Sequence, residues 1–240
     1  MRAPLAIFLL LLPLAACAGK TPPLDACAAN AMCAARRAEP QLLVPEHSMR
    51  HGNDLVLLPL HGEKLIFTDN GKACEDADIE HCVGYALVGF SIPAHAFVVE
   101  IFYYEGGDFL LLDSGSGRKT PLNGLPVFSP DGAEFLVAPY DDETDSGSNN
   151  LEIWRRDGDG AVLEWAHPFK QAFAEDPSLE QLYQVAVSGW DGNRIRLVLT
   201  EPGTSRRWTG SIIRDAQGWH LSAISPPDLR QSGPRQSGSR

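Results

Sequence analysis

The chain is poor in cationic residues, with 20 Lys and Arg against 31 Asp and Glu and a formal net charge of −11 at pH 7. A protein that binds nucleic acid needs a basic face to neutralise phosphates, and this composition supplies none. We therefore expect no nucleic acid among its partners. An anionic lipid surface is an equally poor partner for the acidic body of the chain.

The sequence also lacks the motifs that usually carry catalysis. The nearest matches to a Gly-x-Ser-x-Gly elbow, Gly115-Ser-Gly117 and Ser188-Gly189, are not placed between a strand and a helix. No glycine-rich loop precedes a helix to hold phosphates. His47 and His51 have the spacing of helical zinc ligands, but a flanking proline and glycine crowd the segment, and no Glu follows the first His. We assign no catalytic residue.

Long hydrophobic runs are missing except at the N-terminus. Met1 and Arg2 precede an apolar run from Ala3 to Leu14, which is followed by small residues before Cys17. A short positive region, an apolar core of about a dozen residues and small residues at the cleavage point are typical of a secretory signal, which is too short to span a bilayer. We therefore assign residues 1–16 to a signal peptide.

The end of this signal, Leu14-Ala15-Ala16-Cys17, resembles the lipobox of bacterial lipoproteins. The resemblance implies cleavage before Cys17 and acylation of its thiol and new amino group with chains such as palmitate. Two or three acyl chains anchor a protein stably, whereas one chain binds a membrane only marginally. Ala18 and Gly19 follow, without the Asp that tends to retain lipoproteins in the inner membrane of enteric bacteria. The resemblance therefore implies the outer membrane, with the protein facing the periplasm.

Four further cysteines, an even number, suit an oxidising compartment and predict two disulfides. The Ala-rich stretch around Cys27 and Cys33 predicts a short helix over residues 24–37. Six residues of helix span about 9 Å, which is too far for a disulfide, so an intact helix would direct both thiols to Cys74 and Cys82. Pairing of sequence neighbours, Cys27 with Cys33 and Cys74 with Cys82, is the simpler alternative. The acidic loop between Cys74 and Cys82 is either a solvated surface loop or a site for a cation or a basic partner.

From residue 51 to residue 225 the chain reads as a run of short apolar or alternating segments separated by Gly, Pro, Asn and Asp. Each segment has strand length and is rich in β-branched and aromatic residues, and Asp-Gly and Gly-Gly pairs between them suit tight hairpins. We therefore predict an antiparallel all-β domain over residues 51–225, preceded by a lipidated linker with the short helix over residues 17–50. The predicted strands cover residues 55–58, 64–67, 85–90, 97–104, 109–112, 134–137, 151–154, 162–165, 185–187, 194–199, 209–213 and 220–224.

These hairpins repeat. Residues 126–138, followed by residues 150–160, have a looser copy in residues 186–199, followed by residues 210–218, about sixty residues further on. A propeller blade is typically about forty residues long, and a helix-like insert at 168–184 accounts for the difference. Residues 107–117 match the second half of this unit as a third, partial copy.

Phe128-Ser-Pro-Asp-Gly132 resembles the strand pair of TolB-type β-propeller repeats, and Leu151-Glu-Ile-Trp-Arg-Arg-Asp-Gly158, which leads to Gly160, resembles the hairpin that follows. The resemblance implies a propeller-like array of antiparallel sheets, and the length of the domain allows about four blades, closed or incomplete. The alternative fold is a β-sandwich. In either fold, Asp-Gly closes a hairpin and so indicates the fold, not a function.

One loop matches the oxygen-ligand spacing of a calcium site. Counted from Asp141, oxygen-bearing side chains fall at the first, third, fifth, ninth and twelfth positions of a twelve-residue loop, as in helix-flanked calcium loops. The glycine comes one place late and the flanks are strands, so a solvated loop between strands is the competing interpretation. We expect no cofactor other than this candidate calcium ion. Its candidate ligands are Asp141, Glu143, Asp145, Asn149 and Glu152.

The polar tail, residues 226–240, repeats Arg-Gln-Ser-Gly and is expected to be disordered. The leading hypothesis is a membrane-anchored periplasmic lipoprotein that acts as a binding or scaffolding module for an envelope protein or glycan, without a catalytic set. The alternative is a cell-envelope hydrolase, or a hydrolase inhibitor, acting on glycan or peptide. Two carboxylates facing each other in one pocket would favour the alternative.

Overall fold

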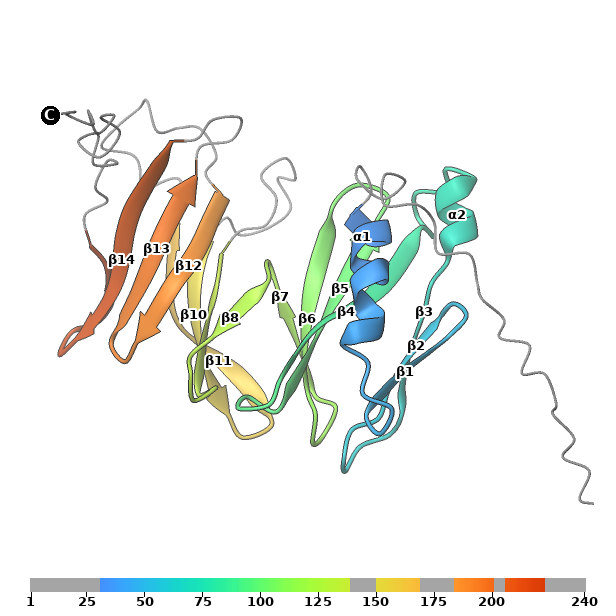
Figure 1. The fold of residues 1–240 in the computed structure, drawn as a ribbon, viewed down its shortest axis with the longest axis horizontal. Coiled ribbons are helices and arrows are strands. Elements are labelled where there is room, and N and C mark those ends of the chain that lie inside the picture. The colour runs from blue at the N-terminus through green and yellow to red at the C-terminus, as the bar shows by residue number, and fades with distance from the viewer. Residues whose placement is uncertain (1–30, 139–149, 169–183, 201–205, 223–240) are drawn as a thin grey trace, which may run out of the picture.

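The computed structural model describes residues 31–138, 150–168, 184–200 and 206–222. Within these ranges the chain forms four antiparallel sheets, two short α-helices, α1 (Ala31–Ala38) and α2 (Gly71–Glu75), and one turn of 3-10 helix, η2 (Glu39–Gln41) (Figure 1). The described chain is therefore mostly β. No helix in these ranges has the length and apolar character needed to cross a membrane.

Each sheet is built from strands that follow one another along the chain, and we number the sheets 1 to 4 in that order. Sheet 1 contains β1 (Ser48–His51), β2 (Asp54–Leu57) and β3 (Leu65–Thr68). Sheet 2 contains β4 (Val83–Ser91), β5 (Ala96–Tyr103), β6 (Gly107–Asp113) and β7 (Lys119–Leu122). Sheet 3 contains β8 (Pro126–Phe128), β9 (Glu134–Val137), β10 (Asn150–Asp157) and β11 (Gly160–Pro168). Sheet 4 contains β12 (Gln184–Asp191), β13 (Arg194–Thr200), β14 (Arg207–Asp215) and β15 (Gly218–Leu221).

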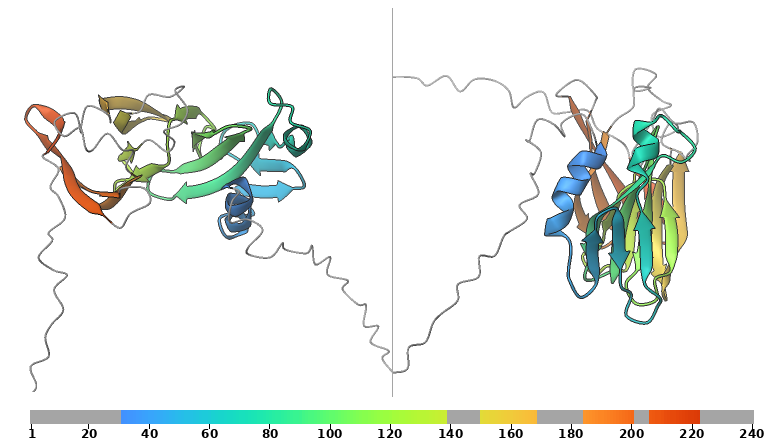
Figure 2. Two further views of the ribbon diagram at one scale, coloured as in Figure 1. Left: turned by 90° about the horizontal axis from the view of Figure 1, so that it is seen from above. Right: turned by 90° about the vertical axis from the view of Figure 1, so that its right-hand side faces the viewer.

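The sheets follow one another along the longest axis of the molecule, with sheet 1 at one end and sheet 4 at the other (Figures 1 and 2). Each pair of consecutive sheets encloses one apolar cluster, so the described core consists of three layers in series. A β-sandwich has two sheets, so the sandwich alternative is wrong for this array of four. The buried members are Leu55, Leu57, Phe67, Leu87, Phe97, Val99, Leu110 and Leu112 between sheets 1 and 2; Ala94, Ala96, Val98, Phe109, Leu111, Leu122, Phe135 and Val137 between sheets 2 and 3; and Leu136, Leu151, Ile153, Ile195, Leu197, Leu199, Ile212 and Trp219 between sheets 3 and 4.

Burial on both faces explains the continuous apolar runs of sheet 2. Successive side chains of a strand point to opposite faces, and in β5 Phe97 and Val99 pack toward sheet 1 while Ala96 and Val98 pack toward sheet 3. A strand covered on both sides needs apolar residues at every position. Each large side chain removed from water in this way contributes about 1.5 to 3 kcal/mol.

Sheet 4 is covered by a neighbouring sheet on one face only. In β13, Ile195 and Leu197 are buried against sheet 3, whereas Arg194 and Arg196 between them are exposed. This strict alternation is the pattern of a strand with one solvated face. Sheet 4 therefore presents its outer face to solvent at the end of the stack.

Sheet 1 lacks the equivalent of the first strand of the other sheets. The loop after β2 bonds to the turn after β6, with Leu60 N donating to Ser114 O over 2.9 Å, so β2 and β6 end at the same edge of the molecule. β6 is the third strand of sheet 2, so β2 takes the place of a third strand in sheet 1, and β1 takes the place of a second strand, as β5 does in sheet 2. Within the described residues no strand precedes β1, and α1 and η2 pack beside β1 and β4 instead.

All twelve predicted strands are present, as β2 to β6 and β9 to β15. Three strands, β1, β7 and β8, are not among the predicted strands, although the TolB-type resemblance of Phe128–Gly132 implies a strand pair there, which β8 and β9 form. β1 carries Arg and His, β7 contains Pro121, and β8 has three residues and begins with Pro126, so none shows the apolar strand pattern. Because β1 begins at Ser48, the β-structure starts before the expected boundary at residue 51.

The predicted repeat corresponds to equivalent strands. Residues 126–138 and 186–199 form the first two strands of sheets 3 and 4, and residues 107–117 contain β6, the counterpart of β10 and β14. Sheet 2 repeats sheet 3 in detail, because the pairs Phe90–Phe97 and Phe128–Phe135 occupy the same register, with ring centroids 4.9 Å and 5.5 Å apart. Gly132, with φ of 71°, lies against the backbone of Pro93 and Ala94, where a Cβ would collide.

The N-terminal helix is partly as predicted. In the described residues it runs from Ala31 to Ala38 and packs on β4, where Gly84 has no side chain to collide with Met32. The earlier part of the expected helix, residues 24–30, lies outside the described residues, as do the signal peptide, Cys17, the insert at 169–183 and the tail 226–240.

Candidate functional site

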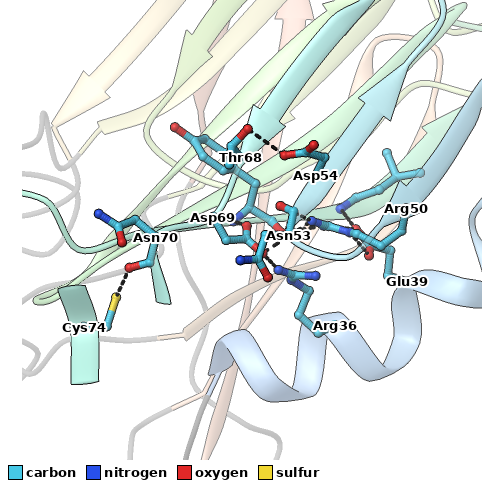
Figure 3. Close-up of polar contacts among 11 residues, drawn as sticks. Arg36, Glu39, Arg50, Asn53, Asp54, Thr68, Asp69, Asn70 and Cys74 are labelled. Atoms are coloured by element: carbon cyan, nitrogen blue, oxygen red, sulfur yellow. Dashed lines mark hydrogen bonds and ion pairs between the residues drawn. The ribbon is translucent and has the colours of Figure 1, made fainter. Parts of the chain in front are cut away.

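Four buried or half-buried charges meet where α1 and η2 contact sheet 1 and the edge of sheet 2 (Figure 3). Glu39 accepts two hydrogen bonds from Arg50, from Nη2 over 2.7 Å and Nε over 2.9 Å. Asp69 is ion-paired with Arg36 and lies 3.4 Å from Nη1 of Arg50. Two carboxylates and two guanidinium groups thus balance in charge at one place.

This cluster also occupies the free edge of β4. Leu87 N donates to Glu39 Oε1 and Tyr85 N donates to Asp69 Oδ1, each over 2.8 Å, while the Tyr85 carbonyl accepts from Arg50 Nη2 over 2.7 Å. These backbone groups would otherwise be left without partners at a sheet edge. All four carboxylate oxygens of Glu39 and Asp69 are paired with guanidinium or backbone N–H groups. We therefore assign the cluster a structural role and not a ligand-binding one.

Cys74 and Cys82 form a disulfide, with Cα atoms 4.5 Å apart, and close the acidic loop. The alternative in which they bond to the N-terminal helix is therefore wrong, because Cys74 and Cys82, eight residues apart, bond to each other. Cys33 is also disulfide-bonded; Cys27 lies outside the described residues. Within the loop, His81 Nδ1 lies 3.0 Å from Asp78, and both side chains are exposed.

Neither metal candidate is assembled in the described part of the chain, which contains no group of three metal-ligating side chains. His47 lies before β1 and His51 ends β1, where its Nε2 lies 3.1 Å from Met49 Sδ, so the pair shares no helix and the zinc interpretation is wrong. Of the calcium candidates, Asp141, Glu143, Asp145 and Asn149 are outside the described residues or have no described side chain. Glu152 is buried in β10 and accepts from Trp154 Nε1 over 3.0 Å.

Glu100 is the most perturbed carboxyl group in the described chain. It lies on the face of β5 that carries Val98, directed toward sheet 3, opposite Phe109 in the register, and is 8% exposed. Burial raises the pKa of Glu100 to about 7. Glu152 also faces this layer, from β10. Nothing in the sequence distinguishes Glu100 from other polar residues of strands, because its burial comes from sheet 3, thirty residues away.

The outer face of sheet 4 carries a hollow of about 300 Å³. Small hydroxyl side chains on neighbouring strands leave this space: Ser188 lies at a bulge in β12, and Thr209 and Ser211 lie on β14. Among the described residues, Arg196 of β13 is the one charged residue that lines it, and its guanidinium lies over Gly189, where a Cβ would be 3.1 Å from Nε and Nη2. The lining residues are Ser188, Arg196, Leu197, Thr209, Gly210, Ser211 and Ser222.

The arginines of this outer face differ from other arginines of sheets 2 to 4, including Arg214 of β14, which pairs with Glu134 of sheet 3. Arg118, Arg155, Arg156 and Arg214 each lie within 3.0 Å of a carboxylate oxygen. Arg194, Arg196 and Arg207 form no ion pair within the described residues, although acidic residues are in excess in this chain. Two acids, Asp191 and Asp215, lie at the hairpin end of the same face. The alternation in Arg194-Ile-Arg-Leu197 is the sequence signal that points to this exposed face.

No protein-family model matches the chain, and no curated protein matches it. Among solved structures it is similar to the crystal structure of the N-terminal domain of Nup159, with 8% sequence identity and a TM-score of 0.37. The match covers 73% of this chain and 47% of that one, so the chain spans about half the length of the structure it matches.

Proposed function

We propose that the chain is an exported lipoprotein, held in the outer membrane by acyl chains on Cys17, whose β-domain is a binding module facing the periplasm. Its partner in this proposal is an envelope component, protein or glycan. The observation that carries the proposal is the solvent-open hollow on the outer face of sheet 4, which combines hydroxyl groups with an arginine that forms no ion pair within the described residues. A few convergent polar groups fix the orientation of a ligand in a binding site, and this hollow provides such groups.

We further infer that the four sheets are blades of a propeller-like array of the TolB type that does not close into a ring. The inference is supported by the strand order within each sheet, by packing between consecutive sheets, and by the position of sheets 1 and 4 at opposite ends of the stack. An unclosed array leaves an outer blade face free to bind a partner. The closed rings of ordinary propellers cover every such face.

The proposed anchor is tested by labelling growing bacteria with a palmitate analogue. The wild-type chain should incorporate the label and fractionate with the outer membrane. The Cys17→Ser variant should carry no label and should be recovered in the soluble fraction. Labelling that survives this substitution would contradict lipidation at Cys17.

The proposed binding function is tested with the isolated envelope fraction of the same cells. The labelled mature protein should bind this fraction saturably, and an excess of unlabelled protein should displace it. Binding that is not saturable, or that a heat-denatured sample reproduces, would mean that the domain has no specific envelope partner.

A hydrolase acting on glycan or peptide is the second candidate, with Glu100 as its candidate acid; burial between sheets 2 and 3 raises the pKa of Glu100 to about 7, and the role requires this 8% exposed group to reach the substrate. A carboxyl group with a pKa near neutrality suits a general acid. Release of soluble fragments from the envelope fraction, lost in Glu100→Gln, would support this candidate. Release of fragments that is unchanged in Glu100→Gln would exclude Glu100 as the acid.

A further inference from the structure

We propose that the hollow on the outer face of sheet 4 binds the free carboxyl terminus of a peptide, with Arg196 pairing with the carboxylate. The proposal rests on the binding function proposed above and names the chemical group that this function recognises. Arg196 on β13 and Ser211 on β14 provide donors, and Ser188 on β12, whose hydroxyl donates to the Arg196 carbonyl over 3.3 Å, offers an acceptor oxygen.

Charge matching favours a carboxylate. Arg196 is the one charged residue lining the hollow, and it forms no ion pair within the described residues. A planar guanidinium binds a carboxylate through two parallel hydrogen bonds, so one arginine neutralises one carboxylate. A phosphate group carries up to two charges and would leave one of them uncompensated here, while Asp191 and Asp215 lie further along the same face.

Size and the surrounding hydroxyl groups favour the end of a peptide. A hollow of about 300 Å³ is at the small end of ligand sites, enough for one or two residues but not for a folded partner. Thr209, Ser211 and Ser222 can donate to the second carboxylate oxygen and to the last peptide carbonyl. Ser188, which donates to the Arg196 carbonyl, can accept from the peptide N–H.

The placement of aromatic residues argues against an acidic sugar. Proteins commonly hold sugar rings against an aromatic face. Trp190, Trp208 and Trp219, the tryptophans of sheet 4, all pack toward sheet 3 and leave no aromatic ring among the residues that line the hollow. A peptide terminus needs hydrogen bonds and a positive charge, which are the features that the hollow offers.

The proposal is tested by calorimetry on the full chain, purified in detergent, with N-acetyl-dialanine as the probe at concentrations up to about 10 mM. Its C-terminal amide, which has the same shape without the charge, should bind at least about tenfold more weakly, since a charge-assisted hydrogen bond is worth a tenfold change or more. Arg196→Gln should weaken binding of the acid by a similar factor. Absence of binding to the wild-type chain, or equal binding of acid and amide, would overturn the proposal.

Arg194→Gln is the matched control, because it removes the same charge from the same face of the same strand but does not line the hollow. It should retain binding within about twofold, as expected for a screened charge. An equal loss of affinity in both variants would indicate that the probe responds to the net positive charge of the face and not to a specific site at Arg196. Binding of inorganic phosphate or glucuronate as tight as that of the peptide acid would also overturn the assignment. If the wild-type chain and Arg196→Gln bind the envelope fraction equally, the proposed binding function is retained, but the hollow is not the site that carries it.

Discussion

Glu100 shows how a single residue can make the stability of this protein depend on pH. Its folded-state pKa, about 7, lies above the ordinary value of 4.5, because the charged form is disfavoured between sheets 2 and 3. A carboxyl group with a raised folded pKa stabilises the fold in its neutral form. Its contribution is therefore complete below the ordinary value and is lost as the pH rises from about 4.5 to about 7.

Glu100→Gln keeps the shape and removes the titration. We expect the variant to match the wild type at pH 4.5 and to exceed its free energy of unfolding by about 2 kcal/mol at pH 8. Urea denaturation at the two pH values checks this. A difference between the proteins that is the same at both pH values would show that Glu100 does not titrate between its two states.

Glu39 is the residue on which the charge cluster depends. Its carboxylate is 3% exposed and holds Arg50 and the Leu87 amide together. Glu39→Gln leaves Asp69 as the one carboxylate for two guanidinium groups, Arg36 and Arg50, and should cost about 3 kcal/mol, since breaking a buried pair is far more costly than losing an exposed one. Chemical denaturation measures this loss. Glu80→Gln, in the exposed loop, is the control and should change stability by less than about 0.5 kcal/mol. A loss below 1 kcal/mol in Glu39→Gln would mean that water replaces the pair.

At the scale of elements, the disulfide between Cys74 and Cys82 links α2 to the start of β4. It closes a short loop, with a sequence separation of 8, so the chain-entropy model predicts a contribution of about 2.5 kcal/mol. The variant Cys74→Ser with Cys82→Ser should lower the melting temperature, while N-acetyl-dialanine binding is kept, because sheet 4 lies at the other end of the stack. Calorimetric scans of both proteins check the shift. An unchanged melting temperature would show that sheet packing alone orders the loop.

Strands with apolar sequences could be predicted from the sequence, whereas the short or polar strands that pair with them could not. The runs in β5 and β6 indicate strands whichever sheet covers them, and the Asp-Gly turns mark hairpins. β8 was hidden because three residues beginning with Pro126 carry too little pattern, and β1 because Arg50 and His51 are polar. Arg50 is polar for a tertiary reason: it pairs with Glu39, eleven residues earlier, across an element boundary.

The candidate site on sheet 4 could not be predicted from the sequence either, and the reason is physical. The hollow brings together Ser188, Arg196 and Ser222, which lie on β12, on β13 and after β15, and no local spacing records that register. The alternation in β13 shows that Arg196 is exposed. It becomes a candidate ligand-binding residue only because no acid among the described residues pairs with it, which is a property of the assembled face.

At the scale of the whole molecule, a stack in series predicts graded local stability. Sheets 2 and 3 are covered on both faces, whereas sheet 4 contributes to one apolar layer. In arrays whose units contact only their neighbours, the end units open first. We therefore expect amides of β13 to exchange at least about tenfold faster than those of β5, as measured by native-state hydrogen exchange with mass spectrometry. Equal protection in the two strands would show that the stack unfolds as one cooperative unit.

Because the sheets follow one another in chain order along one axis, the two ends of the stack differ. The chain enters through α1, beside sheets 1 and 2, and each later sheet is added further along the same axis, so the face with Arg196 is the last and most remote surface. If Cys17 is held in a bilayer, the three sheets before sheet 4 act as a spacer. They would hold the carboxylate-binding face away from the acyl chains, and lengthening the stack would extend its reach without altering what it recognises.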